Sequence, residues 1–100
     1  MYDMKNLAKL KTLSELAPEA FHWFMAFDEA AFKGGSIPLK YKELMAVAVA
    51  LTTQCPYCIE IHSTRARAAG ATAQELAETT LVAAALRAGG AVTHGTHMLE

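Results

Sequence analysis

The sequence predicts an all-α fold, because two observations favour helices and a third argues against a sheet. Apolar residues recur at helical spacing in several segments. Prolines and glycines lie where such segments begin and end. No segment alternates apolar and polar residues over the length of a strand. We therefore expect a small helical domain over residues 1–100, with five to six helices around a central antiparallel helix hairpin.

The first two predicted helices precede the hairpin. In residues 4–16, leucine recurs at every third position from Leu7 onward, which indicates an amphipathic helix. Pro18 suits the first turn of a second helix, since proline fits the first helical position. This helix is rich in aromatic residues, and we expect Gly34 and Gly35 to end it.

The third and fourth predicted helices form the hairpin. Pro38 opens a helix over residues 39–53, whose centre is apolar on all sides and is therefore expected to be buried. Pro56 begins the next helix and leaves Cys55 near its N-cap. Gly70 is a natural residue to follow the end of that helix.

The last part of the sequence predicts one long helix and one short helix. Thr72 and Glu75 have the spacing of a capping box, which indicates a fifth helix over residues 73–88. Gly89 and Gly90 are expected to interrupt it. Residues 91–99 then form a sixth, frayed helix.

Composition excludes several classes of partner. The net charge is −1 and no basic cluster is present, so nucleic acid is not an expected partner. The longest wholly apolar stretch, residues 44–51, is too short to span a bilayer, and the N-terminus lacks the apolar core of a signal peptide. We therefore expect a cytoplasmic protein with no membrane partner. Because 53% of the residues are apolar, more than a small monomer buries, we also expect a homo-oligomer.

Both cysteines lie at the start of the fourth predicted helix. Cys55 and Cys58 are three residues apart on one helix face, with Cα atoms roughly 5 Å apart, which a disulfide tolerates. A helix N-terminus stabilises a thiolate and lowers the cysteine pKa. His62 follows Cys58 by four residues on the same face, where its imidazole can take the thiol proton. In a cytosolic protein these residues predict a thiol-redox site.

Two other interpretations of these residues stay open. The cysteines could be two buried thiols, since free cysteine often behaves as a small apolar residue. Zinc is the stronger rival, because Cys55, Cys58, His62 and Glu43 would supply four ligands. Structural zinc sites normally use two separated ligand pairs, which favours the redox interpretation. A c-type haem would need His directly after the second cysteine, where Ile59 stands.

Glu43 lies near the start of the third predicted helix. Taken alone, it is typical of a solvated carboxylate in a first turn. In a hairpin that turns at Gln54, Glu43 lies roughly 16 Å from the turn along one helix and His62 roughly 12 Å along the other. A direct contact, a contact through a bridging water and no contact all stay open. The geometry permits a Glu–His–Cys relay without requiring one.

The spacing of Glu43, Cys55, Cys58 and His62 resembles the signature of the alkylhydroperoxidase D-like family, which belongs with the carboxymuconolactone decarboxylases. The similarity extends over residues 37–97 and includes the segment 38–51 and the Ala-Gly-Ala turn at residues 69–71. The resemblance implies a single alkylhydroperoxidase D-like helical domain that assembles as a trimer or hexamer.

The resemblance also implies a disulfide-cycling peroxidase, and we expect no cofactor or metal. Cys58 would attack a peroxide, Cys55 would resolve the sulfenic acid to a disulfide, and His62 and Glu43 would move protons. The substrate would be a peroxide or disulfide, and the reductant a thiol on a lipoyl-bearing or thioredoxin-like protein. Tyr57 stands where the best-known members carry His before the second cysteine. The alternatives are a zinc- or ligand-binding helical oligomer without turnover and a γ-carboxymuconolactone decarboxylase.

Overall fold

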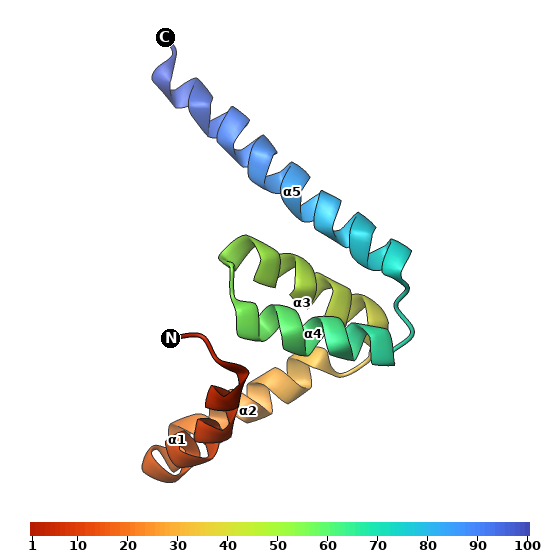
Figure 1. Ribbon diagram of the computed structural model, residues 1–100. Helices are drawn as coiled ribbons and strands as arrows, with labels where there is room; N and C mark the ends of the chain where they lie inside the picture. Colours follow the sequence, from red (N-terminus) through yellow and green to blue (C-terminus); the bar gives the residue numbers. More distant parts are fainter. The chain divides into compact units, whose positions relative to one another are not determined.

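The computed structural model describes residues 1–100 and contains five α-helices, two short 3₁₀ helices and no strand (Figure 1). The predicted all-α class is therefore confirmed. The chain divides into two compact units, Met1–Leu39 and Lys40–Glu100. None of the helices combines the length and the apolar character that a bilayer-spanning segment requires.

The first unit holds η1 (Met4–Lys9), α1 (Leu10–Leu16) and α2 (Pro18–Phe32). The structure thus replaces the first half of the helix predicted over residues 4–16 with a 3₁₀ helix. Of the four leucines, only Leu7 lies in this 3₁₀ helix, whereas Leu10, Leu13 and Leu16 lie in α1, so the repeat itself is α-helical as predicted. Pro18 begins α2 as predicted. No residue of these three helices is buried.

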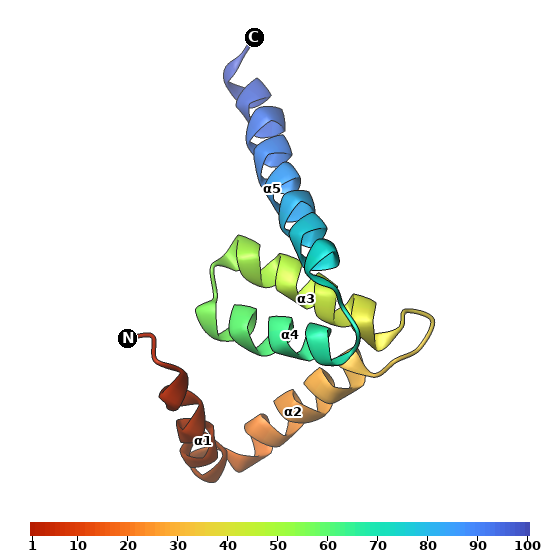
Figure 2. The same ribbon diagram turned by 45° about the vertical axis from the view of Figure 1, so that its right-hand side comes forward.

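The second unit is built on the hairpin of α3 (Leu39–Thr53) and α4 (Pro56–Ala68). The two helices lie side by side and run in opposite directions in both views (Figures 1 and 2). The predicted hairpin is therefore confirmed, with both helices at the predicted positions. Its buried apolar side chains are small or medium in size, and come mainly from α3: Leu44, Val47, Ala50 and, on α4, Ala66.

The end of α4 is fixed by local hydrogen bonds. Gly70 has φ +100°, a conformation that favours glycine. The backbone N–H of Gly70 donates to the Arg67 carbonyl at 3.0 Å, and that of Ala71 donates to the Ala66 carbonyl at 2.9 Å. This pair of bonds is the Schellman motif, which ends a helix at a left-handed residue. The chain therefore turns sharply from α4 toward the next helix.

Helix α5 (Ala73–Gly95) is longer than predicted. It runs through Gly89 and Gly90, so the predicted interruption and the separate sixth helix are wrong. A glycine costs about 1 kcal/mol relative to alanine inside a helix, and this helix is otherwise rich in good helix formers. Only the short 3₁₀ helix η2 (Thr96–Met98) follows it.

Helices α3 and α5 run in the same direction with a fixed register. Lys40 Nζ at the start of α3 lies 3.0 Å from a carboxylate oxygen of Glu75 near the start of α5. Near the far end of α3, the Arg87 guanidinium donates a hydrogen bond to the Thr52 carbonyl oxygen. In each pair, the two residues are 35 positions apart in the sequence. Between the two contacts, open grooves of about 330 and 170 Å³ lie along the seam of α3 and α5.

Candidate functional site

The turn between α3 and α4 places Cys55 at the start of a helix. Gln54 adopts a left-handed conformation, with φ 57°, and reverses the chain. Cys55 follows as the N-cap of α4, and its backbone N–H donates to the Ala50 carbonyl oxygen at 3.1 Å. Its sulfur accepts a hydrogen bond from the backbone N–H of Cys58 at 3.3 Å. The sequence-predicted N-cap position of Cys55 is therefore confirmed.

Cys55 and Cys58 form a disulfide within the chain. Their Cα atoms are 5.3 Å apart, which is within the range that a disulfide accepts. Both residues are half-buried. Because the two cysteines are in the cap and the first turn of one helix, the bond can open and close without refolding the chain.

Glu43 and His62 are in direct contact across the hairpin. A Glu43 carboxylate oxygen lies 2.6 Å from Nδ1 of His62. Glu43 is 2% exposed and is the only buried charged residue, whereas the His62 side chain is 15% exposed. The sequence left open whether these two residues meet, and the structure answers that they do so without a bridging water. The long glutamate side chain spans the offset along the two helix axes.

The carboxylate at Nδ1 determines what the imidazole can do. A hydrogen bond to one ring nitrogen fixes the orientation and the tautomer of the ring, so that proton exchange takes place at the other nitrogen, Nε2. Cys58 precedes His62 by one turn of α4, and helical side chains lean toward the N-terminus of their helix. This geometry favours an approach of the ring to Cys58. The arrangement brings together a cysteine pair, an imidazole and a buried carboxylate, which are all four of the sequence-predicted site residues.

In this structure, the four residues that could have bound a zinc ion make bonds to one another instead. Glu43 bonds to His62, and the sulfurs of Cys55 and Cys58 bond to each other. No three His, Cys, Asp or Glu side chains in the chain are grouped so as to hold a metal ion.

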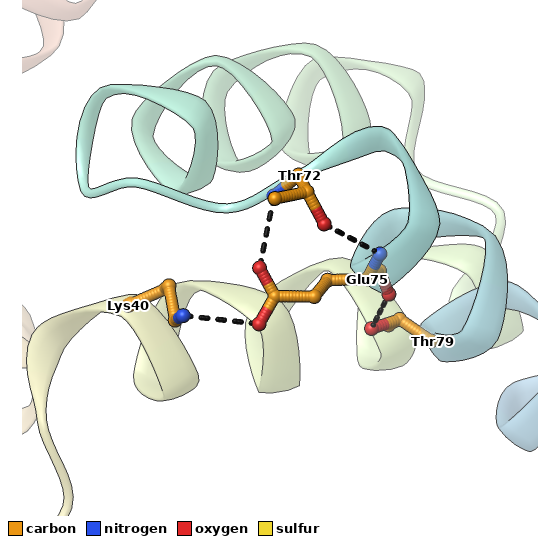
Figure 3. A network of polar contacts seen from close by, with 4 residues as sticks. All are labelled: Lys40, Thr72, Glu75 and Thr79. Carbon is orange, nitrogen blue, oxygen red and sulfur yellow. Dashed lines mark hydrogen bonds and ion pairs between the residues drawn. The ribbon is translucent and has the colours of Figure 1, made fainter.

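A second polar network lies next to this site and was only partly foreseen from the sequence (Figure 3). The capping box is present, since the Glu75 backbone N–H donates to the Thr72 hydroxyl at 3.1 Å and the Thr72 backbone N–H donates to Glu75 Oε1 at 2.9 Å. The ion pair between Lys40 and Glu75 Oε2 joins this cap to α3. Sequence reasoning missed the ion pair, because no local pattern connects residues so far apart in the chain.

Charge and hydrogen bonding shift the pKa values of both members of this ion pair. The backbone N–H of Thr72 and, after it, the Lys40 ammonium hold the pKa of Glu75 below its ordinary value. The Glu75 carboxylate in turn raises the pKa of Lys40. Both groups are therefore charged over a wide range of pH around neutrality.

The fold and the sequence are shared with proteins from several organisms. A protein from Methanobacterium thermoautotrophicum has 34% sequence identity and a TM-score of 0.82, over 88% of this chain and 99% of its own. A carboxymuconolactone decarboxylase family protein from Legionella pneumophila has 35% identity and a TM-score of 0.78, over 82% of this chain and 73% of its own.

Sequence relatives agree with the structural ones. An uncharacterized protein of the cox locus of Paracoccus denitrificans is 45% identical over 76% of this chain. The chain spans 52% to 68% of the length of the curated relatives that it matches. The family model for the carboxymuconolactone decarboxylase family matches residues 18–100, from α2 to the end of the sequence. The chain therefore belongs to the carboxymuconolactone decarboxylase family.

Proposed function

We propose that this protein is a thiol-dependent peroxidase, or disulfide oxidoreductase, that cycles the Cys55–Cys58 disulfide. The observation that carries the proposal is the disulfide at the start of α4 with a carboxylate-bound imidazole one turn further along the same helix. A cysteine pair supplies two electrons, and the imidazole supplies a place for the proton.

In the first step the Cys58 thiolate attacks a peroxide. His62 Nε2 takes the proton of the Cys58 thiol, and Glu43 stabilises the imidazolium that forms. The sulfur then forms a bond to one peroxide oxygen while the O–O bond breaks. The departing alkoxide takes the proton from His62 and leaves as an alcohol. Cys58 is oxidised to a sulfenic acid, and the peroxide is reduced.

In the second step the Cys55 thiol attacks the sulfenic sulfur of Cys58. The S–S bond forms and water leaves, which takes the oxygen and two protons. The 5.3 Å between the Cα atoms means that this step needs no large movement of the chain. An external dithiol, on a lipoyl-bearing or thioredoxin-like protein, then reduces the disulfide by exchange and is itself oxidised to a disulfide.

Two physical effects compete to decide which sulfur attacks. The helix N-terminus favours a thiolate at the N-cap, Cys55, by about 0.3–1 kcal/mol at an exposed position and by up to about 2 kcal/mol at a partly buried one. His62 favours Cys58, the cysteine one turn away from it. A positioned base typically adds about 10²–10⁴-fold to a rate. We therefore assign the attack to Cys58 and the resolving role to Cys55.

Single cysteine variants test this assignment. With Cys55→Ser, we expect a peroxide to convert Cys58 to a sulfenic acid that a dimedone-type reagent traps, while turnover stops because no resolving thiol is present. With Cys58→Ser, the reaction with peroxide should fall to that of an ordinary thiol. A fast, trappable sulfenic acid at Cys55 in the Cys58→Ser variant would reverse the assignment.

The function itself is tested by peroxide consumption against a panel of dithiol reductants. The expected result is turnover that requires both cysteines. Decarboxylation of γ-carboxymuconolactone that survives the loss of both cysteines would contradict the proposal. Stoichiometric zinc in protein purified without chelator, together with no reversible disulfide in a thiol titration, would also contradict it.

A further inference from the structure

The hairpin that carries the site is joined covalently at one end only. The Gln54–Cys55 turn connects α3 to α4 at that end. At the other end α3 begins and α4 finishes without a direct link. Glu43 lies close to this open end, four residues after the start of α3 and roughly 16 Å from the turn. Its 2.6 Å contact with His62 therefore needs the open end of the hairpin to be held.

The polar network described above closes the open end. Helix α4 ends in the Schellman turn at Gly70, and the chain enters the capping box of Thr72 and Glu75 directly afterwards. Figure 3 shows the Glu75 carboxylate between its two partners: one oxygen accepts from Thr72, and the other lies against Lys40. Lys40 is one helical turn before Glu43 on α3. A short path of polar contacts therefore leads from the end of the His62 helix to the turn that holds Glu43.

Buried side chains, Leu44 and Ala66, also hold α3 against α4 near this end, but α5 packs on α3 less completely. An open groove of about 330 Å³ lies along the seam of α3 and α5 and is lined by residues that include Leu44, Met45 and Val82. The two polar contacts at the ends of the seam contribute to the register of α5 on α3, together with buried residues such as Val47 and Ala83. The Lys40 and Glu75 side chains are 26% and 31% exposed, and isolated pairs with such exposure add little to global stability. The expected effect of this pair is on local geometry.

We propose that Lys40 and Glu75 are positioning residues for the site: by closing the open end of the α3–α4 hairpin, they hold Glu43 against His62. This inference rests on the proposed function for its effect on rate, whereas its effect on the Glu43–His62 contact is independent of that function.

Four variants separate positioning from a general loss of charge. Glu75→Gln removes the charge but keeps an oxygen that can accept from the Thr72 backbone, so the helix cap survives. Lys40→Met removes the ammonium and keeps the length of the side chain, and Lys40→Arg keeps the cation. Glu78→Gln is the matched control, because it makes the same charge change one turn further along α5, where Glu78 accepts from Gln74 of its own helix.

The first readout is the ring ¹⁵N chemical shift of His62, measured by NMR on each full-length variant. Glu43→Gln defines the shift of a ring without its carboxylate. We expect Glu75→Gln and Lys40→Met to move the Nδ1 signal toward that reference, and Lys40→Arg and Glu78→Gln to leave it in place. An unmoved signal in both Glu75→Gln and Lys40→Met, with helicity retained, would overturn the inference.

The second readout is the rate at which peroxide oxidises Cys58 in a Cys55→Ser background. We expect Glu75→Gln and Lys40→Met to slow this step by on the order of tenfold, below the roughly 10²-fold that a misplacement of 1 Å can produce. Because the two residues act as one contact, the double variant should be no slower than either single variant. A moved His62 signal with an unchanged rate would support the positioning role and would contradict the proton relay of the proposed function.

Discussion

At the scale of single residues, Glu43 is the position where function and stability are expected to conflict. It is the one buried charged side chain, and burying a carboxylate opposes folding unless hydrogen bonds offset the loss of water. We expect Glu43→Leu to leave the free energy of unfolding within about 1 kcal/mol of the wild type or to raise it, since the partly exposed His62 can bond to water. The oxidation of Cys58 by peroxide should slow by about 10²-fold.

Denaturant unfolding and the sulfenic-acid assay on one preparation check both parts of this prediction. Glu43→Gln is the matched control, because it keeps the side-chain shape and a hydrogen-bonding group. A destabilisation by Glu43→Leu of several kcal/mol would show that the carboxylate serves the fold.

Gln54 is the second residue with a specific expectation. It is the only non-glycine residue with positive φ, and the left-handed region costs an L-residue about 1–2 kcal/mol. Gln54→Gly should therefore leave stability unchanged or raise it by up to about 1 kcal/mol, after the greater freedom of glycine in the unfolded chain is counted. Gln54→Val should lower it by about 1–2 kcal/mol, because a β-branched side chain fits this region least well. Urea midpoints that rank valine at or above glycine would contradict this reasoning.

The four candidate site residues could be proposed from the sequence, but the contacts between them could be derived only in part. The Cys55–Cys58 geometry and the position of His62 depend on one helix, whose periodicity fixes them. The contact between Glu43 and His62 depends on how two helices are rotated about their own axes, and spacing along the chain does not determine this rotation. For the same reason, no local sequence pattern predicts the ion pair between Lys40 and Glu75.

At the scale of elements, helix α5 offers a test of its two central glycines. An added Cβ at Gly89 or Gly90 would meet nothing within 4 Å in this chain. Each substitution by alanine should therefore raise the free energy of unfolding by about 0.5–1 kcal/mol, because glycine is the weaker helix former. Denaturant unfolding of the two single variants measures this. A loss of stability would indicate that another helix approaches the backbone at this point, as in a subunit contact.

The cap of α5 predicts a change of stability with acid pH. Because the pKa of Glu75 is lowered in the fold, its contribution is fully present above its ordinary value of 4.5 and is lost as the pH falls through the lowered pKa. Over this acid range the wild type should lose more stability than Glu75→Gln does. Urea midpoints at a series of pH values measure the difference, and Glu78→Gln should follow the wild type. Parallel curves for Glu75→Gln and the wild type would count against the assignment.

Helix ends were predictable where the signal is local. Pro18, Pro56, Gly70 and the Thr72–Glu75 box each satisfy or free backbone groups within a few residues, and each lies at the predicted boundary. The interruption at Gly89 and Gly90 was predicted wrongly. The low helix propensity of the two glycines is offset by the helix-forming residues on both sides of them.

At the scale of the whole molecule, apolar side chains on both units indicate assembly. On α2, Trp23, Phe24 and Phe27 are 64%, 58% and 70% exposed, and on α5, Leu81 and Leu86 are 68% and 69% exposed. Large apolar side chains exposed together on one element are typical of a subunit contact. We propose a homo-oligomer, a trimer or hexamer, as the family resemblance implies.

Light scattering at micromolar concentration measures the assembly directly, and a stable particle of 10.8 kDa would refute it. Trp23 is the single tryptophan, so its emission reports on the α2 surface. Dilution that dissociates the oligomer should shift this emission to the red, and an emission that stays constant through dissociation would place α2 outside the subunit contact.

The expected single domain over residues 1–100 stays a prediction, which the family match supports from residue 18 onward.

The two contacts between α3 and α5 both span α4, so both depend on its length. One residue inserted in α4 after His62 would advance the end of that helix by about 1.5 Å and turn it by about 100°. Cys55, Cys58 and His62 would keep their spacing, yet Glu75 would arrive on the wrong side of Lys40. Insertions and deletions in α4 after His62 should therefore break the contact between Lys40 and Glu75 while they leave the cysteine pair and His62 in place.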